Sequence, residues 1–219
     1  MASLTRPYQL SSRVLRGDQA GPRLLITGGV HGDEFEPMVA IRRLMGEIGT
    51  DQLRGTVELL PIVNEPAFRR GERTAEDGLD LARVCPGRAD GSTTKQIAHA
   101  LTETIRSADY YIDLHTGGRA FCVLPLTGYS LHADASVLDC QRRMAHAFNL
   151  GVVWGTKPLP GRSLSVAADA GIPAIYAEYF GAAICAAAGV EAYVAGCLNV
   201  MGELGMVDRT ATESCVSVV

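Results

Sequence analysis

Short apolar runs alternate along most of the chain with segments in which apolar residues recur every three to four positions. The apolar runs are typical of buried strands, and the periodic segments are typical of helices with one buried face. We therefore predict strands at residues 23–30, 56–63, 110–114, 121–126, 151–154 and 174–177. We predict helices at residues 36–48, 93–105, 135–148, 163–170 and 190–204.

Strands separated by helices indicate an α/β domain with a mostly parallel sheet. Ser92 is the predicted N-cap of the helix that follows it, and Gly171 and Pro173 are expected to end the helix before them. Residues 64–93 break the alternation because they are polar, charged and without clear periodicity. A loop of this length in a folded domain is usually functional or disordered.

Composition narrows the class of protein. The 219 residues are 47% hydrophobic and 20% charged, which predicts one globular domain over residues 1–207 and a short polar tail at 208–219. A net charge of −4 gives no support for a nucleic-acid or membrane partner. None of the six cysteines forms a CxxC pair, and the start has no apolar signal core, so we expect a reduced, cytoplasmic setting.

Candidate metal ligands follow two of the predicted strands. In GGVHGDEFEP, residues 28–37, His31 and Glu34 come directly after the first strand, and His115 follows the strand at 110–114. Sites in α/β sheets form at the carboxyl ends of strands, so these side chains are expected to meet. Two imidazoles and one carboxylate form a known catalytic zinc set with a fourth position open to water. Asp113 is either a partner of His115 or a solvated residue at the strand end.

Other interpretations of these residues stay open. Two histidines and a carboxylate also describe the ligands of non-haem iron oxygenases. The remaining histidines, His99, His132 and His146, fall in helical or turn-like segments and receive no role. A serine hydrolase is disfavoured because GRSLS, residues 161–165, lacks the second glycine of the G-x-S-x-G motif.

Four ordered motifs carry a family resemblance: GGVHGDE, NEPAFRRGERTAEDGLDLARVCPG, DLHTG and GIPAIYAEYFG. Together they resemble the aspartoacylase/succinylglutamate desuccinylase family of zinc amidohydrolases over residues 24–207. The resemblance implies a zinc-carboxypeptidase-like, three-layer α/β domain with a mostly parallel mixed sheet. It also implies hydrolysis of the amide bond of an N-acyl amino acid.

The resemblance assigns roles to named residues. It implies one Zn²⁺ per chain on His31, Glu34 and His115, with Glu178 as general base and Arg73 polarising the scissile carbonyl. The resemblance implies substrate-binding roles for Arg83, Arg162 and Asn64. The two arginines are expected to bind a carboxylate of the substrate. Burial at the end of an apolar strand is expected to raise the pKa of Glu178.

Two departures from the family pattern affect the expected substrate. Ala82 stands where the family has an asparagine, and we expect the chain to lack the C-terminal β domain of many members. The expected partner is a small N-acyl amino acid or a short peptide, and a homo-oligomer is possible. A zinc carboxypeptidase, a cell-wall peptide amidase and an inactive metal-binding protein are the alternative functions.

Overall fold

The computed structural model describes residues 8–209 and the backbone of residues 217 and 218. Its strands are β1 (Arg13–Arg16), β2 (Gln19–Thr27), β3 (Arg54–Leu60), β4 (Tyr110–His115), β5 (Cys122–Ser130), β6 (Val152–Thr156), β7 (Ala174–Gly181) and β8 (Ser217–Val218). Its α-helices are α1 (Phe35–Glu47), α2 (Glu65–Arg70), α3 (Thr93–Arg106), α4 (Ala135–Phe148), α5 (Ser163–Asp169) and α6 (Ala187–Glu203), and a 3₁₀ helix, η1, spans Leu81–Arg83.

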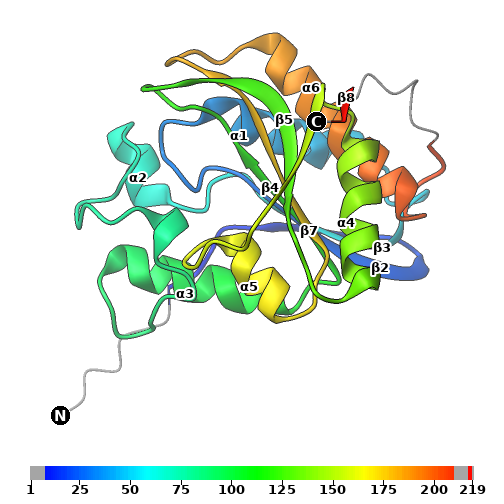
Figure 1. Ribbon diagram of the computed structural model, residues 1–219, viewed down its shortest axis with the longest axis horizontal. Helices are drawn as coiled ribbons and strands as arrows, with labels where there is room; N and C mark the ends of the chain where they lie inside the picture. The colour runs from blue at the N-terminus through cyan, green and yellow to red at the C-terminus, as the bar shows by residue number, and fades with distance from the viewer. Residues whose placement is uncertain (1–7, 210–216, 219) are drawn as a thin grey trace.

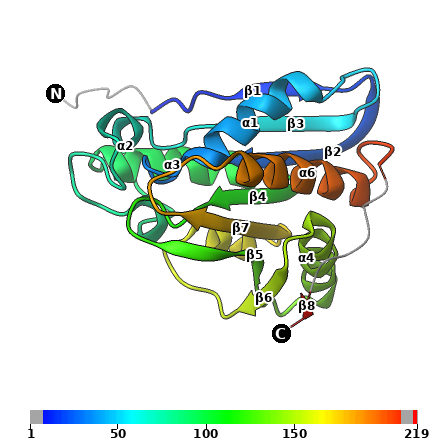
Figure 2. The same ribbon diagram turned by 90° about the horizontal axis from the view of Figure 1, so that it is seen from above.

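The strands form one mixed sheet in the order β1-β3-β2-β4-β7-β5-β6-β8, which can be followed from strand to strand in Figure 2. The β1–β3 and β5–β7 pairs are antiparallel, and the other neighbouring strands are parallel. The predicted fold class, a mostly parallel mixed sheet, is therefore confirmed.

Helices cover both faces of this sheet, which gives three layers (Figures 1 and 2). Successive residues of β7 alternate between the layers, as the two-residue period of a strand requires. Ile175 and Ala177 pack in the core beneath α1, α4 and α6, whereas Ala174 and Tyr176 pack on the side of α3 and α5. Each face of the sheet therefore has its own apolar core.

Two parts of the fold differ from the sequence-based expectation. The pattern did not reveal β1, because Leu15 is its one buried residue and the strand is held at the sheet edge by backbone pairing with β3. Residues 64–93 are not a structureless loop, since they contain α2 and η1. Both helices are short, and each begins at a side-chain cap: Asn64 accepts a hydrogen bond from Ala67 N, and Asp80 accepts one from Ala82 N.

The N-cap of α3 also differs from the prediction. Ser92 occupies the cap position but makes no side-chain bond to the helix backbone. Asp77 replaces it from the preceding loop: its Oδ2 accepts from Thr94 N at 2.9 Å, and its Oδ1 accepts from Thr94 Oγ1 at 2.6 Å. The long loop is therefore attached to the start of α3 by one carboxylate.

The predicted C-terminal tail lies mostly outside the described residues, which omit 210–216 and 219. Within that tail, β8 pairs in parallel with β6, which the polar sequence did not indicate. The domain boundary near residue 207 stays a prediction. Among the helices that the structure describes, none combines the length and the apolar character needed to cross a bilayer.

Candidate metal centre and active site

The carboxyl ends of three neighbouring strands bring the candidate residues together. Strands β2 and β4 pair Thr27 with Asp113, and β4 and β7 pair His115 with Glu178. His31 follows β2 after a turn at Gly29, whose φ is +63°. A Cβ at Gly29 would lie 2.9 Å from the Cα of Ile62, so the turn that positions His31 has no room for a side chain.

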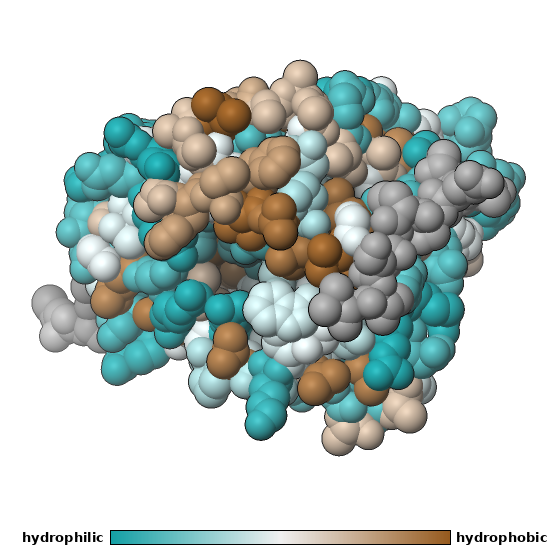
Figure 3. All heavy atoms as spheres, turned by 45° about the horizontal axis from the view of Figure 1, so that its top comes forward, coloured by the Kyte–Doolittle hydropathy of each residue, from teal (hydrophilic) through white to brown (hydrophobic). Residues whose placement is uncertain are grey.

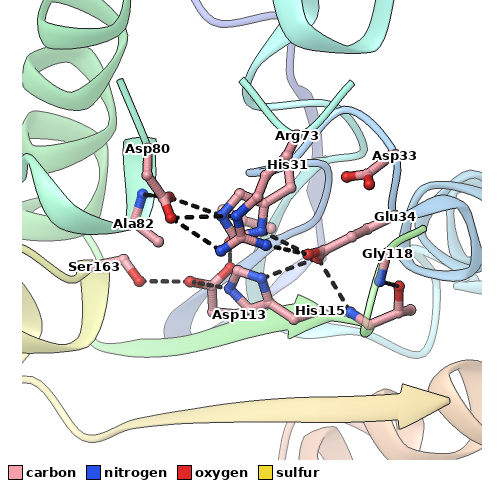
Figure 4. A network of polar contacts seen from close by, with 12 residues as sticks. His31, Asp33, Glu34, Arg73, Asp80, Ala82, Asp113, His115, Gly118 and Ser163 are labelled. Atoms are coloured by element: carbon pink, nitrogen blue, oxygen red, sulfur yellow. Dashed lines mark hydrogen bonds and ion pairs between the residues drawn. The ribbon is translucent and has the colours of Figure 1, made fainter. Parts of the chain in front are cut away.

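His31, Glu34 and His115 form the centre of this group. Glu34 Oε1 lies 2.6 Å from His31 Nδ1, and Glu34 Oε2 lies 3.1 Å from His115 Nδ1. One ligand atom from each of the three residues lies within 4.8 Å of the other two. Figure 4 shows the two imidazoles converging on the single carboxylate. The structure thus brings together all three of the metal ligands predicted from the sequence.

A second carboxylate contacts the far nitrogen of each imidazole. His31 Nε2 lies 2.9 Å from Asp80 Oδ1, and His115 Nε2 lies 3.2 Å from Asp113 Oδ2 (Figure 4). With a cation bound beside Glu34, these contacts would favour the tautomer in which Nε2–H donates to the carboxylate and the Nδ1 lone pair is left for the metal. Metal-binding histidines in proteins are usually oriented in this way, so the donor set fits a divalent cation such as Zn²⁺.

Asp113 is held in place by two hydroxyl groups. Thr27 Oγ1 donates to its Oδ1 at 2.8 Å, and Ser163 Oγ donates to its Oδ2. Only 1% of Asp113 is exposed, which rules out the solvated strand-end alternative. Burial alone would raise the pKa of this carboxyl, but His115 and the two hydroxyls hold it below its ordinary value. Asp113 therefore remains an anion that can orient His115.

The charges in the centre are strongly coupled. Burial alone would raise the pKa of Glu34, but the neighbouring imidazoles lower it to about 2. Burial alone would lower the pKa of His115, yet Asp113 and Glu34 raise it well above its ordinary value. Thr116 N donates to Glu34 Oε2 at 3.1 Å and supports the carboxylate further. A buried carboxylate between two imidazoles therefore favours a positively charged group at this position.

Glu178 lies beside this group on β7, next to His115 of β4. Its Oε2 is buried and has no hydrogen-bond partner in the described residues. Burial raises its pKa, His115 acts in the opposite direction, and Glu34 adds to the increase. The expected upward shift is therefore confirmed. A buried carboxyl with a raised pKa and a free oxygen is the kind of group that exchanges protons with a ligand.

Arg73 reaches the same centre from the loop after α2. Its Nη1 lies 3.6 Å from Glu34 Oε1, and its Nη2 donates to Asp80 Oδ2 at 3.0 Å. Asp80 therefore contacts His31 and Arg73 at once and links the loop to the metal group. Asp80 lies within one of the four family motifs, but no role for it was predicted. Its position after a polar loop, far from any predicted strand, offered no pattern that would identify it.

A cavity of about 310 Å³ opens beside the metal group, and Arg83 and Arg162 both line it. Arg83 is exposed, and its Nη1 donates to the carbonyl of Ala82. Arg162 Nε is buried without a hydrogen-bond partner in the described residues. Ala82 lines the same cavity, where the family pattern has an asparagine. The two arginines therefore give one side of the cavity a positive charge. No carboxylate of the described residues forms an ion pair with either of them.

Asn64 occupies a different place from the other candidates. It is fully buried, caps α2 through its side-chain oxygen and is absent from the cavity lining. The structure thus places it among the residues that shape the loop before Arg73. Conversely, Ser163, Lys157 and Tyr176 line the cavity although no sequence pattern predicted a role for them.

Apolar side chains gather at the mouth of the cavity. Phe121 and Leu159 line it although they are 68% and 45% exposed, and Val123 contributes from β5. Figure 3 shows hydrophobic residues collected on the face where β5 and the segment leading to α6 lie. The cavity therefore combines a cationic side with an apolar rim.

Comparison with known proteins gives a consistent result. The model of the succinylglutamate desuccinylase/aspartoacylase catalytic domain matches residues 20–204. The N-alpha-acetyl-L-2,4-diaminobutyric acid deacetylase of Halomonas elongata is 39% identical over 132 residues, which cover 59% of this chain and 37% of that protein. The succinylglutamate desuccinylase of Burkholderia lata is 33% identical over 129 residues, covering 51% and 36% respectively.

Solved structures resemble nearly the whole chain. A succinylglutamate desuccinylase/aspartoacylase from Rhodobacter sphaeroides has a TM-score of 0.85 at 31% identity, covering 91% of this chain and 60% of that one. The product-bound ectoine utilization protein EutE (DoeB) of Ruegeria pomeroyi has a TM-score of 0.87 at 27% identity, covering 95% and 65%. The matched region spans little more than a third of those two curated relatives and less than two thirds of both structures.

Proposed function

Because the chain belongs to the succinylglutamate desuccinylase/aspartoacylase family, we propose that it is a zinc-dependent hydrolase that deacylates an N-acyl amino acid. The observation that supports this most strongly is the position of Glu178. A buried carboxylate with a free oxygen lies next to a group of two imidazoles and one carboxylate that suits Zn²⁺.

His31, Glu34 and His115 hold the zinc in this proposal, and Asp80 and Asp113 fix the two imidazoles. Zinc at such a site lowers the pKa of bound water to about 7, which supplies a nucleophile at neutral pH. Arg73 lies 3.6 Å from Glu34 and offers a fixed positive charge to the oxygen of the scissile carbonyl as negative charge develops there.

Glu178 moves the proton. It accepts one from the attacking water and delivers it to the amide nitrogen as the carbon–nitrogen bond breaks, so that a carboxylic acid and a free amine leave. The raised pKa of Glu178 suits both halves of this role, because the group then gains and loses a proton near neutral pH more readily than an exposed glutamate.

Arg83 and Arg162 bind the carboxylate of the amino-acid part of the substrate. A guanidinium group pairs with a carboxylate through two parallel hydrogen bonds, which lysine does less well. Their position supports this assignment, because both arginines line the cavity beside the metal group and neither pairs with a carboxylate of the described residues.

Replacing Glu178 with glutamine tests the proposal. Glu178→Gln keeps the shape of the side chain and removes the base, so kcat should fall about 10²-fold or more while zinc content stays the same. The measurement is turnover of a panel of N-acyl amino acids and short peptides, with zinc determined on the same samples. The panel includes N-acetyl-L-2,4-diaminobutyrate.

Glu76→Gln is the matched control, because Glu76 is exposed and lies outside the cavity lining. It should turn over substrate like the wild type. A Glu178→Gln enzyme with kcat within a few-fold of the wild type would show that another group moves the proton. Iron in place of zinc, without hydrolysis of any panel member, would favour the oxygenase alternative.

A further inference from the structure

Tyr176 lines the cavity, yet the proposed reaction gives it no part. It lies on β7 two residues before Glu178, so both side chains point to the same face of the sheet. Ser163 and Arg162 line the same cavity from the start of α5. Tyr176 is therefore placed between the candidate base and the cationic side of the site.

The ring of Tyr176 is held firmly over the neighbouring strand. Gly128 of β5 is its register partner, and a Cβ at Gly128 would lie 2.1 Å from Tyr176 Cε1 and 2.5 Å from the hydroxyl oxygen. Real Cβ atoms do not approach other atoms this closely. The ring therefore fills space that only a glycine at position 128 leaves free.

The hydroxyl of Tyr176 has no hydrogen-bond partner among the described residues, and it is not one of their buried polar atoms, so a ligand in the cavity can reach it. Burial raises the pKa of Tyr176, Glu178 raises it further, and Arg162 lowers it. The phenol is thus within electrostatic reach of both a carboxylate and a guanidinium group.

Tyr176 and Arg162 therefore both line the cavity, and neither side chain donates a hydrogen bond to another described residue. A ligand with two acceptor oxygens can accept from both. A carboxylate fits best, because its two oxygens can take an O–H donor and a charged N–H donor at once.

We propose that Tyr176 is a specificity-determining residue that, together with Arg162, holds the free carboxylate of the substrate. This inference rests on the proposed function and adds Tyr176 to its carboxylate site. The hydroxyl then helps the enzyme to distinguish a free carboxylate beside the scissile amide from the matching carboxamide or ester.

The test compares two ligands on zinc-loaded protein by isothermal titration calorimetry: N-alpha-acetyl-L-2,4-diaminobutyrate and its carboxamide. Every protein compared, including the one with the wild-type Tyr176, carries Glu178→Gln so that the ligand is not hydrolysed during the titration. The protein with Tyr176 should bind the carboxylate more tightly. Tyr176→Phe removes only the hydroxyl, so it should weaken carboxylate binding about ten- to a hundredfold and leave carboxamide binding and zinc content unchanged.

Tyr110→Phe is the matched control, because Tyr110 begins β4 at the opposite end of the strand from the site and does not line the cavity. It should bind both ligands like the wild type. Combining Tyr176→Phe with Arg162→Gln should cost less than the sum of the two single changes, because both residues contact the same group. A purely structural tyrosine would weaken both ligands equally.

The outcomes separate the two proposals. The assignment of Tyr176 is overturned if the protein with Tyr176 binds the carboxylate and the carboxamide equally tightly, or if it binds neither of them. A Tyr176→Phe variant that keeps wild-type affinity for the carboxylate also overturns it. Selective binding that Tyr176→Phe abolishes, without turnover of any acyl amino acid by the wild type, contradicts the hydrolase proposal but supports the carboxylate site.

Discussion

At the scale of single residues, strand ends predicted the candidate metal ligands and the family resemblance supplied the arginines, whereas Asp80 on the loop was not predicted. His31 and His115 follow apolar strands, so the rule that strand ends converge was enough to bring them together. Asp80 lies in the loop region, and its contacts with His31 and Arg73 depend on how that loop folds back. No local pattern in the sequence predicts that the loop folds back in this way, so only the structure shows the contacts of Asp80.

His115→Ala tests the metal group directly. The change removes one of three protein ligands and leaves the buried carboxylate of Asp113 without its imidazole partner. Zinc affinity should fall sharply, and hydrolysis should be lost. Elemental analysis after dialysis measures the zinc content. His146→Ala, on the exposed side of α4, should keep its zinc. Full occupancy in the His115→Ala protein would remove His115 from the ligand set.

At the scale of elements, periodicity predicted the long helices and the central strands, whereas the short elements escaped it. α2 and η1 have six and three residues, too few to show a helical period, and each depends on a side-chain cap. Asp77 has the same function for α3 from 17 residues away. Contacts of this kind order the polar loop, which places Arg73 and Arg83 in the lining of the cavity.

Asp77→Ala should destabilise the domain by about 1–3 kcal/mol, because it removes a helix cap and a charged acceptor of two hydrogen bonds. Thermal unfolding measures the loss. Asp90→Ala is the control, since Asp90 is exposed and pairs with exposed Arg88. Equal unfolding temperatures for the two variants would show that the loop is held by other contacts.

This stabilisation should also depend on pH. Burial alone would raise the pKa of Asp77, but hydrogen bonds from Ser92 and Thr94 lower it below its ordinary value. A lowered pKa in the folded state stabilises the protein above the unfolded value of about 3.9, and the effect is lost as pH falls through the folded value. The difference between wild type and Asp77→Ala should therefore shrink in acid.

At the scale of the whole molecule, the candidate metal ligands join segments that are far apart in the chain. His31 and Glu34 follow β2, and His115 ends β4 about 80 residues later, with Asp80 contributing from the loop between. A bound metal therefore connects the sheet, the start of α1 and the loop region. Any ligand that binds the folded chain but not the unfolded chain stabilises the fold.

Removing the metal should lower the unfolding temperature. Free zinc at 100 times its dissociation constant adds about 2.7 kcal/mol, which for a chain of this size corresponds to about 5–11 °C. Differential scanning calorimetry with zinc and with a chelator measures the shift. The His115→Ala protein should show little or no zinc dependence. A wild type that unfolds at the same temperature under both conditions would argue against a folded-state metal site.

The strand order has a consequence for how the protein folds. β7 lies between β4 and β5, yet both neighbours precede it in the chain by more than 40 residues. Until β7 is inserted, β4 and β5 each have an edge without its final partner, and Glu178 is not beside His115. Such non-local pairing slows folding and leaves strand edges open to association with other chains. Insertion of β7 therefore places Glu178 beside His115 and joins the two halves of the sheet in one step.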